Sequence, residues 1–254
     1  MMRVLLLGGT SEANALAGLL AGQGDISAIM SFAGRTAAPR LPAIPYRVGG
    51  FGGVDGLLAY LQSEGIEVLI DATHPFAEQI SRHAAIAAGQ AGIPLIHLSR
   101  PAWIQDAGDH WIEVPNMAAA ATALGTIPKR VFLTIGRLQI GAFEAAPQHF
   151  YLIRSIEPIM PAPNLPSHQI ILTRGRLTQI SEEQLLRDYE IEIIVTKNSG
   201  GDATHAKILA ARHLGLPVIM VARPASDLGP ALEDPAQVMR WLRGHQKSLV
   251  PRGV

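Results

Sequence analysis

Short apolar runs alternate along the chain with alanine-rich stretches that are long enough to form helices. Strands that are apolar on both faces and separated by helices are typical of a parallel sheet covered by helices on both sides. The pattern therefore predicts an α/β fold. In the first half it predicts strands at 3–7, 26–32, 68–71 and 94–98, and helices at 12–20, 54–63 and 78–91. In the second half it predicts strands at 131–134, 170–172, 193–196 and 217–221, and helices at 181–189 and 205–214.

The two halves of the chain also resemble each other in sequence. Three strand-forming segments recur in the same order at offsets of 123 to 127 residues: 3–6 with 130–133, 66–70 with 191–195, and 92–101 with 215–224. Parallel strands share a composition, which is the simpler explanation, but three ordered matches at nearly one offset favour an internal repeat. We therefore expect two related Rossmann/flavodoxin-like lobes with parallel sheets and a cleft between them. The expected domains are an N-terminal lobe over 1–125 and a C-terminal lobe over 126–247.

Composition narrows the classes of protein that this chain can represent. Its 254 residues include 21 Lys or Arg and 21 Asp or Glu, and the zero net charge argues against a general electrostatic grip on nucleic acid. The absence of cysteine excludes disulfides, thiolate metal sites and cysteine nucleophiles. No apolar run approaches the roughly 20 residues that a membrane span needs, and the glycine-broken start does not fit a signal peptide. We expect a soluble, cytoplasmic protein.

The end of the chain has a different character. Residues 249–253 resemble the recognition sequence of a protease that removes purification tags. A native tail would look similar, but we interpret 248–254 as a tag remnant and leave it outside the expected fold.

A glycine loop follows the first predicted strand. In open parallel sheets, ligands bind outside the carboxyl ends of the strands, so the loops that directly follow strands are the candidate sites. Here the loop consists of Gly8, Gly9, Thr10, Ser11 and Glu12. Glycines let a ligand approach the backbone, Thr10 or Ser11 can cap the next helix, and the first amides of that helix favour a phosphate. The full Gly-x-Gly-x-x-Gly fingerprint is absent, so an ordinary glycine turn with a helix cap is the alternative.

The loop after the second strand carries a base and no acid. Folds that bind NAD place an acidic residue here for the ribose hydroxyl, whereas an arginine suits the 2′-phosphate of NADP. This stretch contains Ser31, Arg35 and Thr36. If a nicotinamide cofactor binds, these residues favour NADP; a solvated arginine is the alternative.

The loop after the strand at 68–71 combines a hydroxyl, an imidazole and an aromatic ring. Thr73 and His74 come first, Pro75 stiffens the loop, and Phe76 adds a flat apolar face. A loop in this place can contact a nicotinamide or a substrate. A lone histidine is as often a hydrogen-bonded structural residue, so both interpretations of His74 stay open.

Basic and small residues also follow the strands of the second half. An ammonium, a hydroxyl and close-approach glycines ahead of a helix suit a carboxylate or phosphate, and arginines after neighbouring strands add positive charge. For each arginine alone, a solvated surface is the alternative. The residues concerned are Arg137, Arg174, Lys197, Ser199, Gly200 and Gly201.

Several catalytic motifs are missing from the sequence. It has no Gly-x-Ser-x-Gly elbow, no Walker A lysine loop and no His-Glu-x-x-His pair, and its histidines are scattered. Without a nucleophile or a metal set, the chemistry is assigned to a bound cofactor. Two other classes stay open, namely a two-lobed nucleotide-sugar transferase and a non-catalytic small-molecule binding protein.

Four segments carry a resemblance to a known family. They are 7–12 (Leu-Gly-Gly-Thr-Ser-Glu), 71–77 (Asp-Ala-Thr-His-Pro-Phe-Ala), 99–103 (Ser-Arg-Pro-Ala-Trp) and 195–201 (Val-Thr-Lys-Asn-Ser-Gly-Gly). Together they resemble the precorrin-6A reductase family of cobalamin biosynthesis, which includes cobalt-precorrin-6A reductases. The chain departs from the family pattern at 174–177, where Arg-Gly-Arg-Leu stands in place of Arg-Gly-Pro-Phe.

The resemblance implies an oxidoreductase that uses NADPH to reduce one ring double bond of precorrin-6A, giving precorrin-6B. It implies a cofactor on the loops of the first lobe and a tetrapyrrole whose carboxylates pair with the second, with no metal and with neighbouring pathway enzymes as partners. The cofactor-binding residues would be Gly8, Gly9, Thr10, Ser11, Glu12, Ser31, Arg35, Thr36, Thr73 and His74. The substrate-binding residues would be Arg100, Arg137, Arg174, Lys197, Ser199, Gly200 and Gly201. His74 and Lys197 are the candidate catalytic residues, as proton donors.

Overall fold

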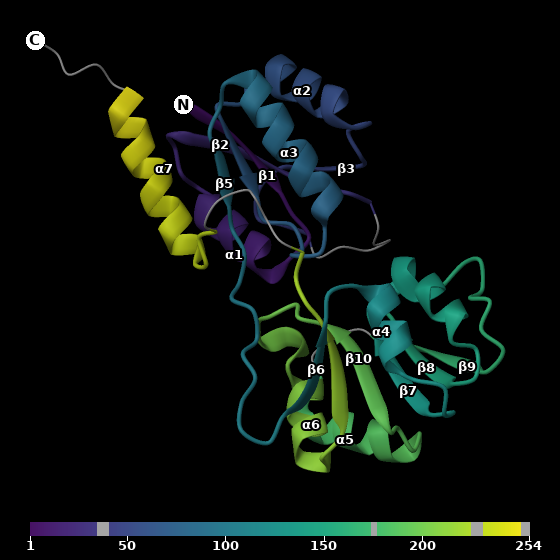
Figure 1. The fold of residues 1–254 in the computed structure, drawn as a ribbon. Coiled ribbons are helices and arrows are strands. Elements are labelled where there is room, and N and C mark those ends of the chain that lie inside the picture. Colours follow the sequence, from purple (N-terminus) through teal and green to yellow (C-terminus); the bar gives the residue numbers. More distant parts are fainter. Residues whose placement is uncertain (35–40, 174–176, 225–230, 250–254) are drawn as a thin grey trace, which may run out of the picture. The chain divides into compact units, whose positions relative to one another are not determined.

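The chain forms two compact units, each built on one parallel β-sheet (Figure 1). The computed structural model describes residues 1–34, 41–173, 177–224 and 231–249. The first unit comprises Met1–Pro101 with Ala225–Val254, and the second comprises Ala102–Pro224. The α/β class and the pair of parallel sheets predicted from the sequence are confirmed. No helix within the described ranges is long and apolar enough to cross a membrane.

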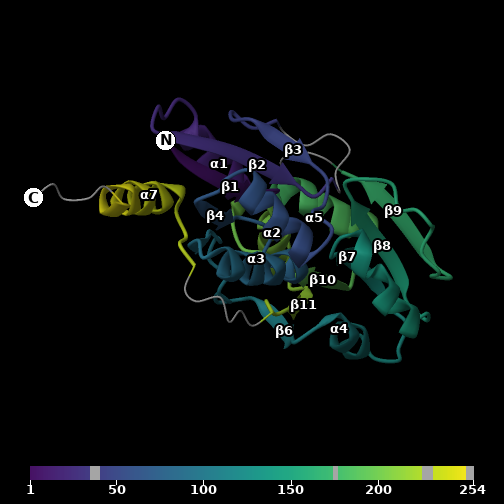
Figure 2. The same cartoon turned by 90° about the horizontal axis from the view of Figure 1, so that it is seen from above.

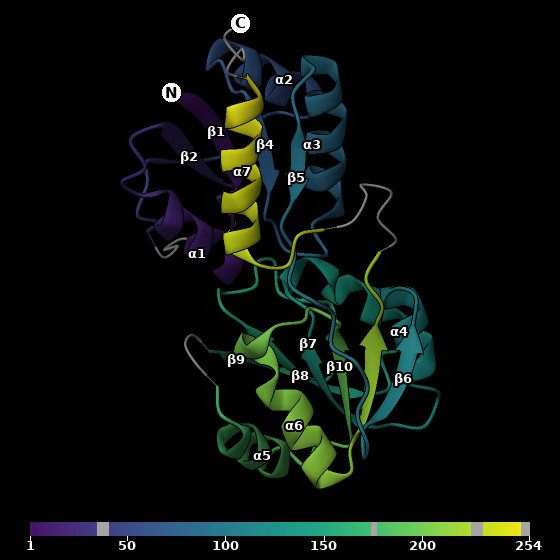
Figure 3. The same cartoon turned by 90° about the vertical axis from the view of Figure 1, so that its left-hand side faces the viewer.

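The first unit has five strands in the order β3-β2-β1-β4-β5. Helices α2 and α3 lie side by side on one face of this sheet (Figure 2), and α1 and α7 cover the other face (Figure 3). The strands are β1 (Met2–Leu7), β2 (Ile26–Phe32), β3 (Tyr46–Val48), β4 (Val68–Asp71) and β5 (Leu95–His97). The helices are α1 (Ser11–Leu20), α2 (Val54–Ser63), α3 (Glu78–Ala91) and α7 (Pro235–Leu249).

Strand β1 shows why this sheet needs helices on both faces. Successive side chains of a strand point to opposite faces of the sheet. Val4 and Leu6 pack with side chains of α1 and α7, whereas Leu5 and Leu7 pack with side chains of α2 and α3. All four side chains are buried, which explains the continuous apolar run in the sequence.

The second unit has six strands in the order β6-β11-β10-β7-β8-β9. Helices α5 and α6 pack against each other and against the sheet in one apolar cluster, and α4 contacts the 3₁₀ helix η1. The strands are β6 (His110–Val114), β7 (Arg130–Thr134), β8 (Phe150–Ser155), β9 (His168–Leu172), β10 (Ile193–Lys197) and β11 (Pro217–Val221). The helices are α4 (Met117–Ala123), α5 (Gln179–Asp188), α6 (Ala206–Leu214), and the 3₁₀ helices η1 (Arg137–Ala145) and η2 (Asp202–Thr204).

The two sheets repeat one arrangement. Strands β1 to β5 occupy the same order in the first sheet as β7 to β11 occupy in the second. The repeat extends to single hydrogen bonds, because Arg3 N donates to Glu67 Oε2 at 2.8 Å and Arg130 N donates to Glu192 Oε2 at 2.7 Å. The three sequence matches between the halves therefore mark equivalent strands.

The boundary between the units differs from the one expected after residue 125. Strand β6 pairs with β11, so the chain has already joined the second sheet by His110. In the opposite direction, Leu232 bridges to Leu98 of the first unit, and α7 then packs on α1. Each sheet therefore takes its last pairing from chain that arrives from the other unit. The sequence matches contain neither of these segments, so they could not locate the crossing points.

The C-terminal helix also corrects the expected end of the fold. Ser248, which the sequence analysis excluded, lies within α7. Residues 250–254 of the supposed tag remnant lie outside the described residues.

A fully buried histidine supports the second sheet. His149 lies directly before β8; its Nδ1 accepts a hydrogen bond from Lys129 N at 3.1 Å, and its Nε2 lies 3.1 Å from the Gly125 carbonyl oxygen. Both interactions are satisfied only by a neutral ring with its proton on Nε2. Burial lowers the pKa of His149 below its ordinary value of 6.5, and the Gly125 carbonyl only partly offsets this effect.

We expect acidification to destabilise the protein through His149. Below pH 6.5, His149 binds a proton in the unfolded chain but stays neutral in the folded protein until a lower pH. The free energy of unfolding therefore falls as the pH drops. Denaturant unfolding above and below pH 6.5 measures this slope, and His149→Gln should reduce it whereas His110→Gln at an exposed histidine should not. A His149 ring that titrates at 6.5 by NMR in the folded protein would contradict the expectation.

Candidate functional site

Five residues form one row across the carboxyl edge of the first sheet. The strand register aligns them in the order Arg47, Ser31, Leu7, Asp71 and His97, one from each strand. Because all strands are parallel, the loops that follow them leave from this same edge. The row therefore locates the candidate site of the first unit.

The glycine loop after β1 is shaped by packing and by backbone conformation. Gly8 N donates to Ser31 O at 3.0 Å, and a Cβ on Gly8 would lie 2.1 Å from Met30 Cε, so the Met30 side chain would have to move to make room for a side chain there. Gly9 has a φ of +122°, which favours glycine, and a Cβ built on it would meet nothing within 4 Å. The loop therefore leaves open space beside Gly9.

Thr10, rather than Ser11, caps helix α1. Its Oγ1 accepts a hydrogen bond from Ala13 N at 3.1 Å and donates one to the Ala72 carbonyl oxygen at 2.8 Å. The hydroxyl thus joins the loop after β1 to the loop after β4. The first amides of α1, on Ser11 and Glu12, have no partner within the helix, so this helix start can accept an anion.

A partly buried ion pair lies at the same helix start. Arg100 Nη1 is 3.1 Å from Glu12 Oε2, and the two side chains are only 13% and 19% exposed. The sequence analysis assigned Arg100 to the substrate, but the structure brings it to the loop that was expected to bind the cofactor. Its guanidinium balances a carboxylate that would otherwise repel a phosphate at this helix start.

Arg47 is a residue that the sequence analysis missed. Its Nη1 donates to Ser31 Oγ at 2.8 Å and to Gly49 O at 3.0 Å, and its guanidinium lies 4.1 Å from the centroid of the Phe51 ring. Within the described part of the chain, no carboxylate lies within ion-pair distance of Arg47. Arg35 and Thr36, the basic and hydroxyl residues expected at this end of the sheet, lie outside the described residues.

Hydrogen bonds hold the loop after β4 in one conformation. Thr73 donates to Asp71 Oδ1 from its amide at 3.0 Å and from its hydroxyl at 2.7 Å. Phe76 N donates to His74 Nδ1 at 3.2 Å, and the two rings lie 5.9 Å apart. A neutral His74 that accepts at Nδ1 carries its proton on Nε2. The structure thus gives His74 a structural hydrogen bond and leaves its role in catalysis a proposal.

The loop after β10 is the counterpart in the second unit. Gly200 and Gly201 have φ values of +67° and +70°, which explains the glycines. The side-chain amide of Asn198 pairs with the backbone of Trp103, accepting from its N at 2.8 Å and donating to its O at 2.9 Å. The indole of Trp103 then donates to Gly201 O at 2.9 Å. Two residues that the sequence analysis left without a role therefore hold Lys197 and its neighbours in place.

Two cations complete the support of this loop. Arg223 donates to Asn198 O at 2.9 Å and to Ser199 O at 3.0 Å. Lys207 is buried, with its Nζ 4.9 Å from the centroid of the Trp103 ring. The match between 92–101 and 215–224 was the sequence clue to Arg223, since it aligns Arg100 with Arg223.

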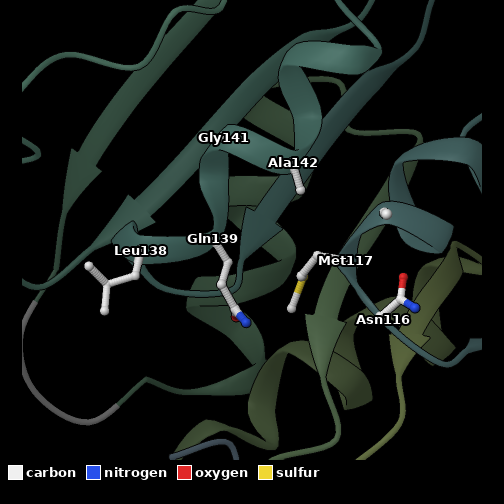
Figure 4. Close-up of a pocket in the computed structure, with 7 residues that line it drawn as sticks. Asn116, Met117, Leu138, Gln139, Gly141 and Ala142 are labelled. Carbon is white, nitrogen blue, oxygen red and sulfur yellow. The ribbon is translucent and has the colours of Figure 1, made fainter. Parts of the chain in front are cut away.

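An open hollow lies between α4 and η1 in the second unit (Figure 4). Its volume is about 480 Å³. Both α4 and η1 begin shortly after the carboxyl end of a strand, and Arg137 is the first residue of η1. Gln139 Oε1 is buried here with no hydrogen-bond partner among the described residues. The hollow is lined by Asn116, Met117, Ala118, Leu138, Gln139, Gly141 and Ala142.

The structure thus sorts the expected site residues by unit. In the first unit it brings together Gly8, Gly9, Thr10, Ser11, Glu12, Ser31, Thr73, His74 and, unexpectedly, Arg100. In the second unit it places Arg137, Lys197, Ser199, Gly200 and Gly201 after the carboxyl ends of β7 and β10. Arg174 lies outside the described residues.

Comparisons with known proteins agree with this geometry. The model of the family "Precorrin-6x reductase CbiJ/CobK" matches residues 3–243. A precorrin-6A reductase of Rhodobacter capsulatus is 48% identical over the full length of both chains, and one of a Sinorhizobium species is 48% identical over 94% of each. A solved structure described as CobK precorrin-6A reductase is 47% identical and superposes over the whole of both chains with a TM-score of 0.89. The chain therefore belongs to the precorrin-6x reductase CbiJ/CobK family.

Proposed function

We propose that the protein reduces one ring double bond of precorrin-6A with NADPH, giving precorrin-6B in cobalamin biosynthesis. The observation that supports this most is the full-length similarity to proteins named precorrin-6A reductases. The two edges differ in character, and we assign the cofactor to the first and the substrate to the second.

The residues of the first edge fit a dinucleotide phosphate. The capped start of α1 offers amides and positive dipole to the pyrophosphate, and the open space beside Gly9 lets the phosphate approach the backbone. Arg47, half-buried and without a carboxylate partner in the described residues, suits the 2′-phosphate that distinguishes NADPH from NADH. NADPH, when bound, supplies the hydride.

The second edge suits a substrate with many carboxylates. Lys197 is the last residue of β10 and leads into a loop whose shape is held by Asn198 and Arg223, so its position is set before a ligand arrives. Arg137 stands beside the hollow between α4 and η1, where Met117 and Leu138 offer apolar surface. A tetrapyrrole combines carboxylates with apolar ring edges, so it matches both kinds of surface.

One titration tests the function. NADPH fluorescence on addition of protein reports cofactor binding, and the loss of NADPH absorbance on addition of precorrin-6A reports its oxidation. Mass spectrometry of the product should show a gain of two hydrogen atoms. Failure to bind NADPH would contradict the proposal, and NADPH binding without turnover would favour a non-catalytic binding protein.

We expect Lys197→Ala to weaken the substrate and not the cofactor. Losing one charge-assisted interaction with a carboxylate should raise KM for precorrin-6A by about 10- to 100-fold, with the Kd of NADPH unchanged. Steady-state kinetics and NADPH fluorescence measure the two effects, and Lys247→Ala, at an exposed lysine of α7, is the matched control. An equal loss of both affinities would contradict the assignment of Lys197 to the substrate.

We expect Arg47→Leu to remove the preference for NADPH over NADH. The variant loses the partner proposed for the 2′-phosphate, so the Kd of NADPH should rise by about 10- to 100-fold while that of NADH stays constant. Fluorescence titrations with both cofactors measure the ratio. Arg82→Leu, at an exposed arginine of the same unit, is the control, and thermal unfolding checks that Arg47→Leu keeps its fold. An unchanged ratio would exclude Arg47 from the cofactor site.

A further inference from the structure

Asp71 is a buried carboxylate for which the proposed binding of cofactor and substrate has no use. Its side chain is 0% exposed at the end of β4. Oδ1 accepts both hydrogen bonds from Thr73, whereas Oδ2 accepts no hydrogen bond among the described residues. Burying a carboxylate in this way is costly unless a positive group lies close to it.

His97 supplies the group that lies closest to this oxygen. It stands beside Asp71 in the parallel register of β4 and β5, and its Nδ1 is 3.3 Å from Asp71 Oδ2. The contact is within ion-pair distance although it is not aligned as a hydrogen bond. The hydrogen-bond partner of Nδ1 is the backbone oxygen of Asp71, also at 3.3 Å. The imidazole is 17% exposed, so it touches a buried carboxylate and still reaches solvent. A protonated His97 would therefore have its charge balanced on one side and could exchange its proton on the other.

The place of this pair in the row fits the chemistry that the hydride requires. Arg47 and Ser31 lie on one side of β1, and Asp71 and His97 lie on the other. A dinucleotide in a fold of this kind crosses the carboxyl edge near the start of the helix that follows the first strand. If its 2′-phosphate meets Arg47, its nicotinamide end belongs on the side of β4 and β5. This step rests on the proposed function.

Few charged side chains other than Asp71 lie close to His97. Within the described residues, Asp71 is the only carboxylate within ion-pair distance of it. Glu78 and Arg82 of α3 lie 3.9 Å from each other and are largely exposed. The other titratable side chains on α3 and on the described chain next to β4 and β5 are Glu67, His74, His83, Arg100 and Glu233, and Arg100 is paired with Glu12.

We propose that His97 donates the proton that accompanies hydride transfer, and that Asp71 positions its ring. The hydride from NADPH forms a C–H bond at one atom of the double bond. The π electron pair of the double bond then moves onto the neighbouring atom. His97 gives its N–H proton to that atom and keeps the N–H electron pair as neutral imidazole. Solvent then returns a proton to the exposed ring. The substrate gains one hydride and one proton, and NADPH becomes NADP⁺.

Three variants test the proposal: His97→Gln, Asp71→Asn and, as a matched control on α3, His83→Gln. We expect His97→Gln to lower kcat for precorrin-6A by about 10²- to 10⁴-fold, the usual contribution of a general acid. The alkaline fall of the wild-type pH profile should disappear in this variant, because Gln cannot lose the donor proton. The Kd of NADPH should stay unchanged, and His83→Gln should keep both the rate and the profile.

A second readout does not depend on turnover. In the protein without ligands, NMR at one pH should show the His97 ring in a different or more mobile orientation in Asp71→Asn than in the wild type, since the carboxylate beside the ring is gone. Thermal unfolding identifies a variant that has lost its fold, and the partly exposed His97 keeps the test available if Asp71→Asn is unstable. An active wild-type protein whose rate and pH profile survive His97→Gln, or an unchanged His97 ring in folded Asp71→Asn, would overturn this proposal alone. A wild-type protein that does not oxidise NADPH with precorrin-6A would overturn the proposed function with it.

Discussion

Parallel pairing of every strand is the constraint on which both candidate sites depend. A parallel ladder puts all carboxyl ends at one edge, and a connection between neighbouring strands must return to the other edge before the next strand begins. The register then aligns Arg47, Ser31, Asp71 and His97 at one level although Ser31 and His97 lie 66 positions apart in the sequence. Charged groups can gather there because strand ends meet solvent, whereas the strand centres are filled by apolar side chains on both faces.

The internal repeat explains why the chain has two sheets with a carboxyl edge each. The two halves of the chain are also linked, because each contributes one segment to the sheet of the other. Each sheet ends on a pairing with chain from the other half: β6 in the second unit and Leu232 in the first. The helices that follow these segments, α4 and α7, occupy equivalent places, since α4 contacts η1 as α7 contacts α1. Residues of the two halves are thus required for each sheet to be complete, and neither half of the sequence corresponds to one unit.

The sequence was most informative where burial dictates composition. Strands β1, β4, β7, β10 and β11 are apolar on both faces, so their runs predicted them, and the helices between them followed. Strands β3 and β6 lie at sheet edges with most side chains at least partly exposed, so their composition carried little pattern. Glycine loops and capping residues were visible as local motifs. Arg47 and His97 were not, because each becomes part of a site only through pairing with a neighbouring strand, and single-sequence patterns do not encode register. Arg100 was assigned to the substrate through the family resemblance, and the fold adds that its guanidinium pairs with Glu12.

Charged side chains are arranged differently at the carboxyl edges of the two sheets. In the first unit, two carboxylates have a basic side chain at short distance: Glu12 lies beside Arg100, and the buried Asp71 lies beside His97. In the second unit, Arg223 and Trp103 donate to the carbonyls of 198–201, while Asn198 pairs with the Trp103 backbone. Those donors stabilise one loop conformation without neutralising a substrate group, because they bind backbone oxygens rather than carboxylates. A proton donor needs a counter-charge to hold its proton, and a polyanion receptor needs fixed geometry with positive charge left over. The difference between the edges therefore follows from the different chemistry proposed for each.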